Sequence, residues 1–343
     1  MRILFLFYFC GMILQRGHSY DHEHCTADNH EVWLCDYMRK HNRTYSSSAE
    51  MNLRRSKLLT STKTHGKVTF GLTSRSDRFV HELKRNVPLI LSSHRKVTRS
   101  YGNVHKHKPS HSLPPIDWRN HNGNSYVTPV KDQGDCGDCF AFAAATVLEY
   151  WSRKHGHPKS LSVQKIMDCT SGPSRPDVGC DGGLMEYVFE YAKNHPIGLD
   201  AQFPYKEAQG TCPQQFITNV KVKQYKVLMH DDNPKTEQQF EAILHKYGPI
   251  SIGIDSTTMD NYKDGIFTAD LCSTDIDHAV TIVGYTPDAW IIKNSWGPYW
   301  GRDGYLYLER GKNACGVAEY AVYVSSAVPA HERQTTQWHM EAV

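Results

Sequence analysis

The stretch DQGDCGDCFAFAAATVLEYWSRKHG, residues 132–156, joins a glycine-broken acidic loop to a strong helical pattern. From Cys139 onward apolar residues recur at helical spacing, with Phe140 and Trp151 among those on one face. Basic residues in the last turn and a closing glycine mark the end of the helix. Asp138 stands where an N-cap residue belongs. The sequence therefore predicts a helix that begins at Cys139.

Two cysteines, Cys136 and Cys139, stand two residues apart in this stretch. Such a pair can be a redox couple, half of a zinc site, a structural bridge, or a nucleophile beside an unrelated cystine. A helix N-terminus favours a thiolate through its unbonded backbone N–H groups and its dipole. Only Cys139 lies there, because Cys136 belongs to the preceding glycine turn. Cys139 is thus the better nucleophile, and we expect its sulfur to be ionised.

The chain has 343 residues, which allows roughly two domains of about 150 residues. Residues 1–19 combine Arg2 with an apolar run and small residues near the end, the pattern of a secretory signal peptide. No later run approaches the ~20 apolar residues of a membrane helix, so we expect no membrane span. The expected location is the secretory pathway, lysosomal or extracellular, where disulfides persist. Asn42, in the sequence NRT, is the predicted glycosylation site.

The charge is unevenly distributed along the chain. Residues 20–112 hold 17 Lys and Arg against 8 Asp and Glu, hence +9, and residues 113–343 hold 20 against 28, hence −8. Opposite charges indicate two parts that attract each other. A nucleic-acid-binding arm is the other interpretation of the basic part, but the aromatic interleaving and motifs of such arms are absent from its sequence. We therefore expect no nucleic-acid partner.

Cysteine parity sharpens the interpretation of Cys139. Of the ten cysteines, Cys10 falls in the signal peptide, and seven lie from Leu113 onward. An odd number in a secreted protein leaves one thiol unpaired. That thiol can be incidental, can form an intermolecular bridge, or can be a reactive residue. No second paired spacing of cysteines or histidines accompanies Cys136 and Cys139, so neither a metal nor any other cofactor is expected.

Helical patterns dominate the front of the region from Leu113, and β-branched and aromatic strand patterns dominate its back. This order predicts an α+β fold of two subdomains with a cleft between them. His278 stands at the start of one predicted strand and Asn294 at the end of the next. An amide carbonyl there can accept the imidazole N–H, and neighbouring strands bring the two residues within reach.

Several motifs in order resemble the papain family of cysteine proteases, and its cathepsin L-like branch in particular. The resemblance covers nearly all of residues 113–324, through the segments PPIDWRNHNGNSYVTPVKDQGDCGDCFAF, LSVQKIMDC, GCDGGLMEY, GPISIGID, DHAVTIVGY and IIKNSWGPYWGRDGYLYL. It implies a papain-like fold with a helical left half and a β-barrel-like right half. The implied organisation is a signal peptide at 1–19, an inhibitory propeptide at 20–112, a peptidase domain at 113–324 with a helical half at about 122–228 and a β-rich half at about 229–322, and a loose tail at 325–343.

The resemblance also assigns roles. Cys139 is the implied nucleophile, His278 its imidazole partner, and Asn294 the residue that orients the ring. Trp296 shields that pair from water, and Gln133 donates to the oxyanion. The implied disulfides are Cys136–Cys180, Cys169–Cys212 and Cys272–Cys315, which leaves Cys139 over, in agreement with the parity of the cysteines.

The implied function is that of a cysteine endopeptidase made as a zymogen, with its own propeptide as inhibitor. Peptide substrates would pair with the backbone near Gly182 and Gly183. An apolar pocket would take the side chain two before the cut. The implied pocket residues are Leu184, Met185, Gly253, Ile276, Asp277, Ala279 and Tyr320. Cystatin-type inhibitors are the expected protein partners, and the expected state is a monomer.

Two residues depart from the family's local signature Cys-Gly-Ser/Ala-Cys-Trp/Tyr. Asp138 takes the place of serine or alanine, and Phe140 that of tryptophan or tyrosine. A carboxylate beside the nucleophile opposes the thiolate and raises its pKa. Two alternative functions therefore remain: a catalytically inactive binding protein of the same fold, and a thiol–disulfide oxidoreductase that uses Cys136 with Cys139.

Overall fold

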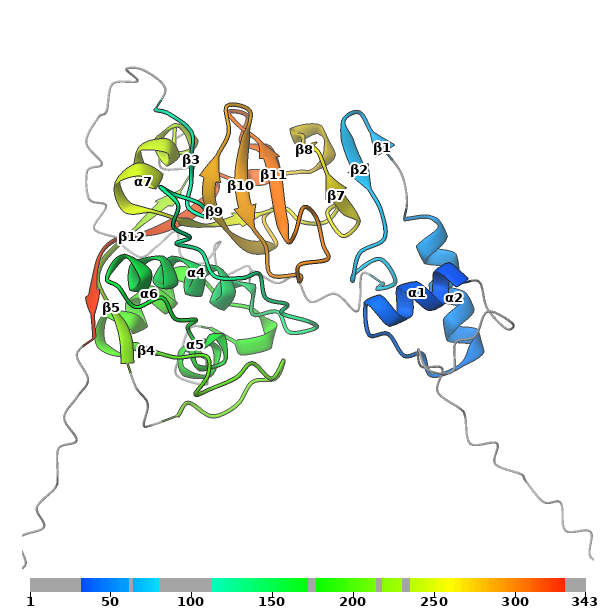
Figure 1. Ribbon diagram of the computed structural model, residues 1–343, viewed down its shortest axis with the longest axis horizontal. Helices are drawn as coiled ribbons and strands as arrows, with labels where there is room; N and C mark the ends of the chain where they lie inside the picture. The colour runs from blue at the N-terminus through cyan, green and yellow to red at the C-terminus, as the bar shows by residue number, and fades with distance from the viewer. Residues whose placement is uncertain are drawn as a thin grey trace, which may run out of the picture. The chain divides into compact units, whose positions relative to one another are not determined.

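The structure is a computed structural model that describes residues 32–61, 64–79, 113–171, 177–213, 218–229 and 235–330 (Figure 1). The chain divides into two compact units, Met1–Thr60 and Ser61–Val343. The predicted signal peptide lies outside the described residues, as do residues 80–112 and most of the predicted tail.

The first unit contains two helices, α1 (Val32–Lys40) and α2 (Ser48–Leu59). Ser47 caps α2, since its hydroxyl accepts the backbone N–H of Glu50 at 3.2 Å. One turn later Arg54 donates to Glu50 at 3.0 Å, an ion pair at helical spacing. Local sequence therefore stabilises α2 at its start and along its side.

Two features of the first unit concern Asn42, the predicted glycosylation site, and Cys35. Asn42 is exposed in a turn with φ of 49°, so its side chain is accessible. Cys35 is disulfide-bonded, and Cys25 lies outside the described residues.

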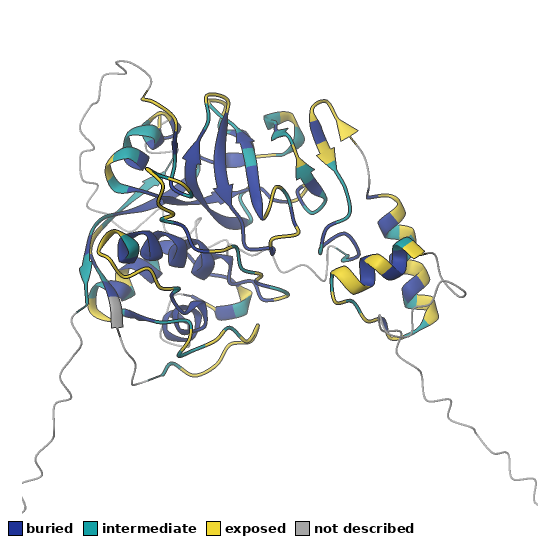
Figure 2. Ribbon diagram, in the orientation of Figure 1, coloured by how far each residue is buried: buried dark blue, intermediate teal, exposed yellow. Residues whose placement is uncertain are grey.

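The second unit is built around the helix predicted at Cys139. This helix, α4 (Cys139–Lys154), is buried along its whole length except for its last two residues (Figure 2). Its neighbours include helices α5 and α6 and strands of the large sheet, so apolar residues occupy most positions around the helix. The remaining helices of the unit are α5 (Val163–Thr170), α6 (Met185–Asn194) and α7 (Phe240–Tyr247), with 3-10 turns η3 (Gly179–Asp181), η4 (Glu237–Gln239), η5 (Ala269–Leu271) and η6 (Ala314–Gly316).

A large mixed sheet forms the rest of the unit, and its strands follow the order β4-β5-β12-β6-β9-β10-β11-β8, with β3 beside β9. The sheet is open, because β4 and β8 at its ends do not pair with each other within the described part of the chain. The predicted barrel-like half is therefore wrong in this respect, although the mixed α+β character is confirmed. The strands are β3 (Ile116–Asp117), β4 (Ile197–Gly198), β5 (Thr218–Met229), β6 (Ile250–Ile254), β8 (Ile266–Phe267), β9 (His278–Tyr285), β10 (Ala289–Lys293), β11 (Tyr305–Glu309) and β12 (Tyr320–Pro329).

Strand β5 comes from the part of the sequence expected to be helical, yet it pairs with β12 over most of its length. The long pairing ties the front of the unit to its back. The two halves are thus joined by backbone hydrogen bonds as well as by side-chain packing.

A smaller sheet has the order β1-β2-β7. Its first two strands come before the peptidase region in the sequence, and β7 belongs to that region. The hairpin β1 (Thr64–His65) and β2 (Val68–Phe70) pairs with β7 (Tyr262–Asp264). Part of the predicted propeptide is therefore docked on the peptidase region by an added strand. No helix among the described residues combines the length and the apolar character needed to cross a membrane.

Candidate active site

Cys139 begins helix α4, and its sulfur accepts the backbone N–H of Ala279 at 3.4 Å. This contact places the first residues of β9 against the N-terminus of the helix. Cys139 is the unpaired cysteine of the described residues and is fully buried. Burial raises the pKa of the Cys139 thiol to about 12, and the charges of Asp138 and Asp277 act in the same direction. In this conformation the group is a thiol, because desolvation outweighs the helix N-terminus that led us to expect a thiolate.

His278 opens β9, and Asn294 follows the end of β10, the neighbouring strand. Nε2 of His278 lies 2.8 Å from Oδ1 of Asn294, which also accepts the backbone N–H of Ser295 at 2.8 Å. Because a backbone N–H can only donate, the atom it meets is the amide oxygen, and Nε2 therefore carries the proton. Nδ1 is left as the nitrogen that can exchange a proton with a nucleophile.

The indole of Trp296 stacks on the imidazole of His278, with ring centroids 4.7 Å apart and an interplanar angle of 27°. Trp300 packs edge-on against Trp296 at 5.1 Å. Both indoles are buried, so the His278–Asn294 hydrogen bond is covered by apolar surface. A buried hydrogen bond is stronger than an exposed one because water does not compete for it.

Gln133 reaches the same region because the loop before α4 pairs with the segment after Asn294. Its backbone N–H donates to the carbonyl of Ser295 at 2.8 Å. Its side-chain oxygen accepts the Ser295 hydroxyl at 2.6 Å, and its Nε2 donates to the carbonyl of Cys136 at 2.8 Å. A primary amide has two N–H groups, and the bond to Cys136 uses one of them. Ser295 thus fixes which way the amide of Gln133 points, a role that sequence reasoning missed.

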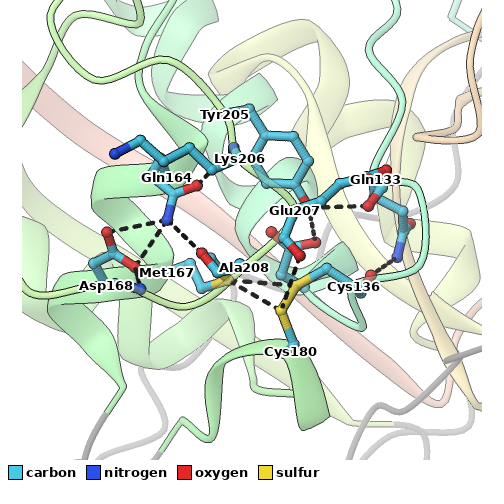
Figure 3. The surroundings of a disulfide bond; sticks show 12 residues. Gln133, Cys136, Gln164, Met167, Asp168, Cys180, Tyr205, Lys206, Glu207 and Ala208 are labelled. Atoms are coloured by element: carbon cyan, nitrogen blue, oxygen red, sulfur yellow. Dashed lines mark hydrogen bonds between the residues drawn. A yellow bond between two sulfur atoms is a disulfide. The ribbon is translucent and has the colours of Figure 1, made fainter.

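The disulfide Cys136–Cys180 holds the loop before α4 against the segment around Gly182 (Figure 3). The backbone N–H of Gly137 also donates to the carbonyl of Cys180 at 2.8 Å. The structure forms Cys169–Cys212 and Cys272–Cys315 as well, the same pairs that the family resemblance implies. With Cys136 in a cystine and Cys139 unpaired, the Cys-x-x-Cys stretch is not a dithiol couple in this structure.

Asp138 occupies the N-cap position of α4, but its side chain makes no capping hydrogen bond, and that part of the prediction is wrong. Its Oδ1 instead accepts the hydroxyl of Tyr205 at 2.9 Å. The same hydroxyl lies 3.0 Å from the carbonyl of Gln133, and Figure 3 shows Tyr205 reaching toward that loop. Burial raises the pKa of Asp138 to about 8. The donor comes from a residue 67 positions away, which local sequence patterns could not reveal.

Gly182 and Gly183 form the turn that leads into α6. Gly182 has φ of 119°, a conformation that other residues rarely adopt. A Cβ on Gly183 would lie 2.7 Å from the ring of Phe140 and 2.6 Å from Oδ1 of Asp177. That carboxylate oxygen also accepts the backbone N–H of Leu184 at 2.9 Å. Phe140 therefore fills the space beneath this turn in place of a larger indole.

The implied pocket residues meet where β6, β9 and β12 run side by side. Gly253 pairs with Ala279, and a Cβ on Gly253 would lie 2.7 Å from Cδ1 of Ile276. Ile276 is partly exposed, whereas Ala279 is buried. Tyr320 is buried as well, and its hydroxyl accepts the backbone N–H of Glu186 at 3.4 Å.

Other implied pocket residues do not present an open surface in this conformation. Leu184 and Met185 are fully buried at the start of α6 and belong to the core. Asp277 accepts both the backbone N–H and the hydroxyl of Ser256, at 2.7 and 2.9 Å, so its carboxylate shapes the neighbouring loop. Of this set, Ile276 is the side chain that combines partial exposure with a position beside Gly253.

A buried polar network lies next to Asn294 and was not foreseen. Lys293 donates to the hydroxyl of Thr128 at 2.9 Å, and that hydroxyl donates to Glu149 of α4. The other carboxylate oxygen of Glu149 accepts the backbone N–H of Leu161 at 2.9 Å. Burial lowers the pKa of Lys293 to about 8, while Glu149 opposes that shift. The network therefore couples α4 to the end of β10.

The segment after β2 covers Trp296. The guanidinium of Arg75 lies over the Trp296 ring, 3.9 Å from its centroid, and donates to Asp260 at 3.1 Å. Ser74 donates to the carbonyl of Trp296 at 3.2 Å. A few residues further on, Arg78 forms a 2.6 Å ion pair with Asp135. Arginines of the basic front segment thus contact acidic residues of the peptidase region, in the direction predicted from the charge distribution.

Comparison with known proteins adds to this geometry. The family model described as papain family cysteine protease matches residues 114–325. The thiol protease SEN102 of Hemerocallis is 38% identical over 228 residues, or 62% of this chain and 60% of the relative, and vignain of Phaseolus vulgaris is 37% identical over 228 residues with the same coverage. The aligned part of the chain thus spans about 60% of these relatives' length.

Two solved precursor structures have the same fold over most of this chain. Digestive procathepsin L 3 of the Tenebrio molitor larval midgut superimposes with a TM-score of 0.72 at 26% identity, covering 86% of this chain and 99% of that one. The proform of the ragweed pollen allergen Amb a 11, a cysteine protease, gives 0.68 at 28% identity, covering 89% and 98%. Because the family model matches well over half of the sequence, the chain belongs to the papain family of cysteine proteases.

Proposed function

We propose that this chain is the zymogen of a cysteine endopeptidase. The observation that carries the proposal is the meeting of an unpaired cysteine at a helix N-terminus with the start of β9, where His278 is held by Asn294. A cysteine nucleophile, a histidine base and a residue that orients the base form the arrangement that acyl transfer requires. Cys139 is the proposed nucleophile and His278 the proposed acid and base.

The reaction divides into two halves. Nδ1 of His278 takes the proton of Cys139, the sulfur attacks the scissile carbonyl, and the carbonyl oxygen becomes an oxyanion. An N–H of the Gln133 side chain and the backbone N–H of Cys139 donate to that oxyanion. His278 then protonates the leaving amine as the carbon–nitrogen bond breaks and an acyl-enzyme remains. A water molecule then gives a proton to His278 while its oxygen attacks the acyl carbon. The carbon–sulfur bond breaks, the acid leaves, and His278 returns the proton to the sulfur of Cys139.

Substrate preference follows from the apolar surroundings of Gly253. Gly253 pairs with Ala279, and Ile276 packs against Gly253 so closely that a Cβ there would lie 2.7 Å from its Cδ1, so this part of the site is aliphatic. We propose that an apolar side chain two residues before the cut lies there, while the substrate backbone pairs near Gly182 and Gly183. Tyr320 limits the depth of the pocket.

The front segment is proposed to inhibit the enzyme until it is removed. Its support is the pairing of β2 with β7 and the cover that Arg75 and Ser74 give to Trp296. Cleavage in the linker before Leu113 would free the enzyme. The predicted signal peptide, the accessible Asn42 and the disulfides fit a protein of the secretory pathway, lysosomal or extracellular. From the family resemblance we also propose that cystatin-type inhibitors bind the enzyme and that it is a monomer.

The decisive test is covalent labelling of the full chain with a thiol-directed epoxide after incubation at pH 5. We expect one label, on Cys139, together with cleavage of peptides that carry leucine or phenylalanine two residues before the cut. The matched control is Cys139→Ala, which keeps the three disulfides described in the peptidase region and should neither label nor cleave. A wild-type chain that folds, loses its front segment and still neither labels nor cleaves would be a catalytically inactive member of the family.

A further inference from the structure

Asp138 is a fully buried carboxyl group directly before the nucleophile. Its Oδ1 and the carbonyl of Gln133 share the single hydroxyl proton of Tyr205, at 2.9 and 3.0 Å. Its Oδ2 is also buried and has no hydrogen-bond partner among the described residues. A carboxylate with one shared donor and one unsatisfied oxygen is costly to bury. The neutral acid is therefore the favoured form well above the usual pH range of a carboxyl group.

The groups around Asp138 reinforce this preference. Glu207 and Asp168 add negative potential at Asp138, and Asp132 does so at the hydroxyl of Tyr205. Cys139, the next residue in the chain, contributes a second group that can become negative. The Tyr205 hydrogen bond acts in the opposite direction, because it stabilises the ionised carboxylate. Together these effects raise the pKa of Asp138 to about 8, with burial as the largest cause.

We propose that Asp138 and Tyr205 form a proton-dependent control of the nucleophile. While Asp138 is neutral, Cys139 can give its proton to His278 and become a thiolate. When Asp138 loses its proton to water, its negative charge opposes ionisation of Cys139 and favours the neutral thiol. No other bond changes in this step. Asp138 and Tyr205 are positioning residues, because they act through Cys139 and the Gln133 loop. This inference rests on the proposed protease function.

The control predicts an enzyme that loses activity as the pH rises through the range in which Asp138 ionises. The Tyr205 hydroxyl lowers the midpoint of that loss, since it favours the charged form of Asp138. Removing the hydroxyl should therefore raise the midpoint, whereas removing the carboxyl should abolish this part of the loss. Damage to the fold would instead lower activity at every pH. The two variants thus give different signatures from a merely structural role.

The test measures kcat/KM and the rate of Cys139 alkylation by iodoacetamide from pH 4.5 to 9.5, on the full chain after activation at pH 5. We express kcat/KM at pH 8.5 as a fraction of each chain's own value at pH 5.5. That fraction should be about five to ten times larger for Asp138→Asn than for wild type, as expected for a titration shifted by about one unit. Tyr205→Phe should move the alkaline limb upward while Asp138 is present and leave it unchanged in the Asp138→Asn background. The control is Asp135→Asn. It removes a charge three residues before Asp138, from a side chain that is 61% exposed, and should leave the alkaline limb in place.

Superimposable alkaline limbs for wild type and Asp138→Asn would overturn the proposal. If Asp138→Asn does not fold, Asp138→Ser provides the same comparison with the residue that the family signature places there. A Tyr205→Phe variant whose limb moves downward would also contradict it. Wild-type labelling at Cys139 is read in the same assay, so failure of this control is distinguishable from failure of the protease function.

Discussion

The two sides of the candidate active site hold their reactive groups in different ways. On the β9–β10 side, strand register places His278 beside Asn294, a neutral amide orients the ring, and the indole of Trp296 stacks on that ring. On the α4 side, a disulfide-tied loop presents Cys139 next to a buried acid whose donor comes from a distant loop. The comparison shows that the position of the base follows from local pairing, whereas the protonation state of the nucleophile depends on burial and on residues remote in sequence.

The network beneath Asn294 gives the largest expected effect on the β9–β10 side. Lys293→Met leaves Glu149 buried with only neutral donors, so the free energy of unfolding should fall by about 3 kcal/mol at pH 7. Denaturant unfolding of the two chains at pH 7 measures the loss.

The double variant Lys293→Met with Glu149→Gln provides the control for that experiment. It removes both charges, so it should recover much of the stability that Lys293→Met loses. A single variant as stable as wild type would show that the network does not brace this side of the site.

Asn294→Ala tests whether the amide orients the base. We expect kcat to fall by about 100-fold with little change in KM, because the ring loses its orientation in the transition state while substrate contacts remain. Asn294→Gln is the matched control, since it keeps the amide but moves it by one methylene. If kcat survived in Asn294→Ala, strand position alone would be sufficient to orient His278.

The pH dependence of stability tests the α4 side independently of catalysis. The pKa of Asp138 rises from 3.8 in the unfolded chain to about 8 in the folded one, so the folded protein holds a proton that the unfolded chain has lost in between. The contribution of Asp138 to the free energy of unfolding is therefore fully present below about pH 4 and is lost as the pH rises to about 8. Asp138→Asn should therefore gain about 4 kcal/mol on wild type between pH 5 and 8, because each of these three pH units contributes about 1.4 kcal/mol. Thermal unfolding of the two chains at both pH values measures this, and parallel stability profiles would contradict the burial of an uncharged acid.

The smallest expected effect concerns the segment that covers Trp296. Arg75→Ala removes a cation–π contact and a hydrogen bond to Asp260, together worth about 1–2 kcal/mol. The precursor should lose its front segment several-fold faster at pH 6 than wild type, as gel analysis of a time course will show. Lys67→Ala is the control, because it removes an exposed cation of the hairpin that precedes this segment. Equal maturation rates for Arg75→Ala and wild type would mean that this contact does not restrain the enzyme.

Much of this architecture could be predicted from the sequence. Helical spacing predicts α4, and β-branched runs predict the strands that carry His278 and Asn294, because these signals are local. The odd cysteine count also agrees with the unpaired Cys139. The features that could not be predicted depend on distant partners: Tyr205 takes Asp138 away from its capping role, and Ser295 orients Gln133. Arg75 on Trp296 joins residues more than 200 positions apart, and no periodic pattern reports such a contact.

Counting the accessible thiols of the activated chain tests the central claim most directly. Titration with a disulfide reagent under non-reducing conditions, followed by mapping of the modified residue, reports which sulfur reacts. Our account predicts that, among the described cysteines, Cys139 alone reacts and that Cys136 is found bonded to Cys180. Reaction at both Cys136 and Cys139, with reversible formation of a bond between them, would contradict it.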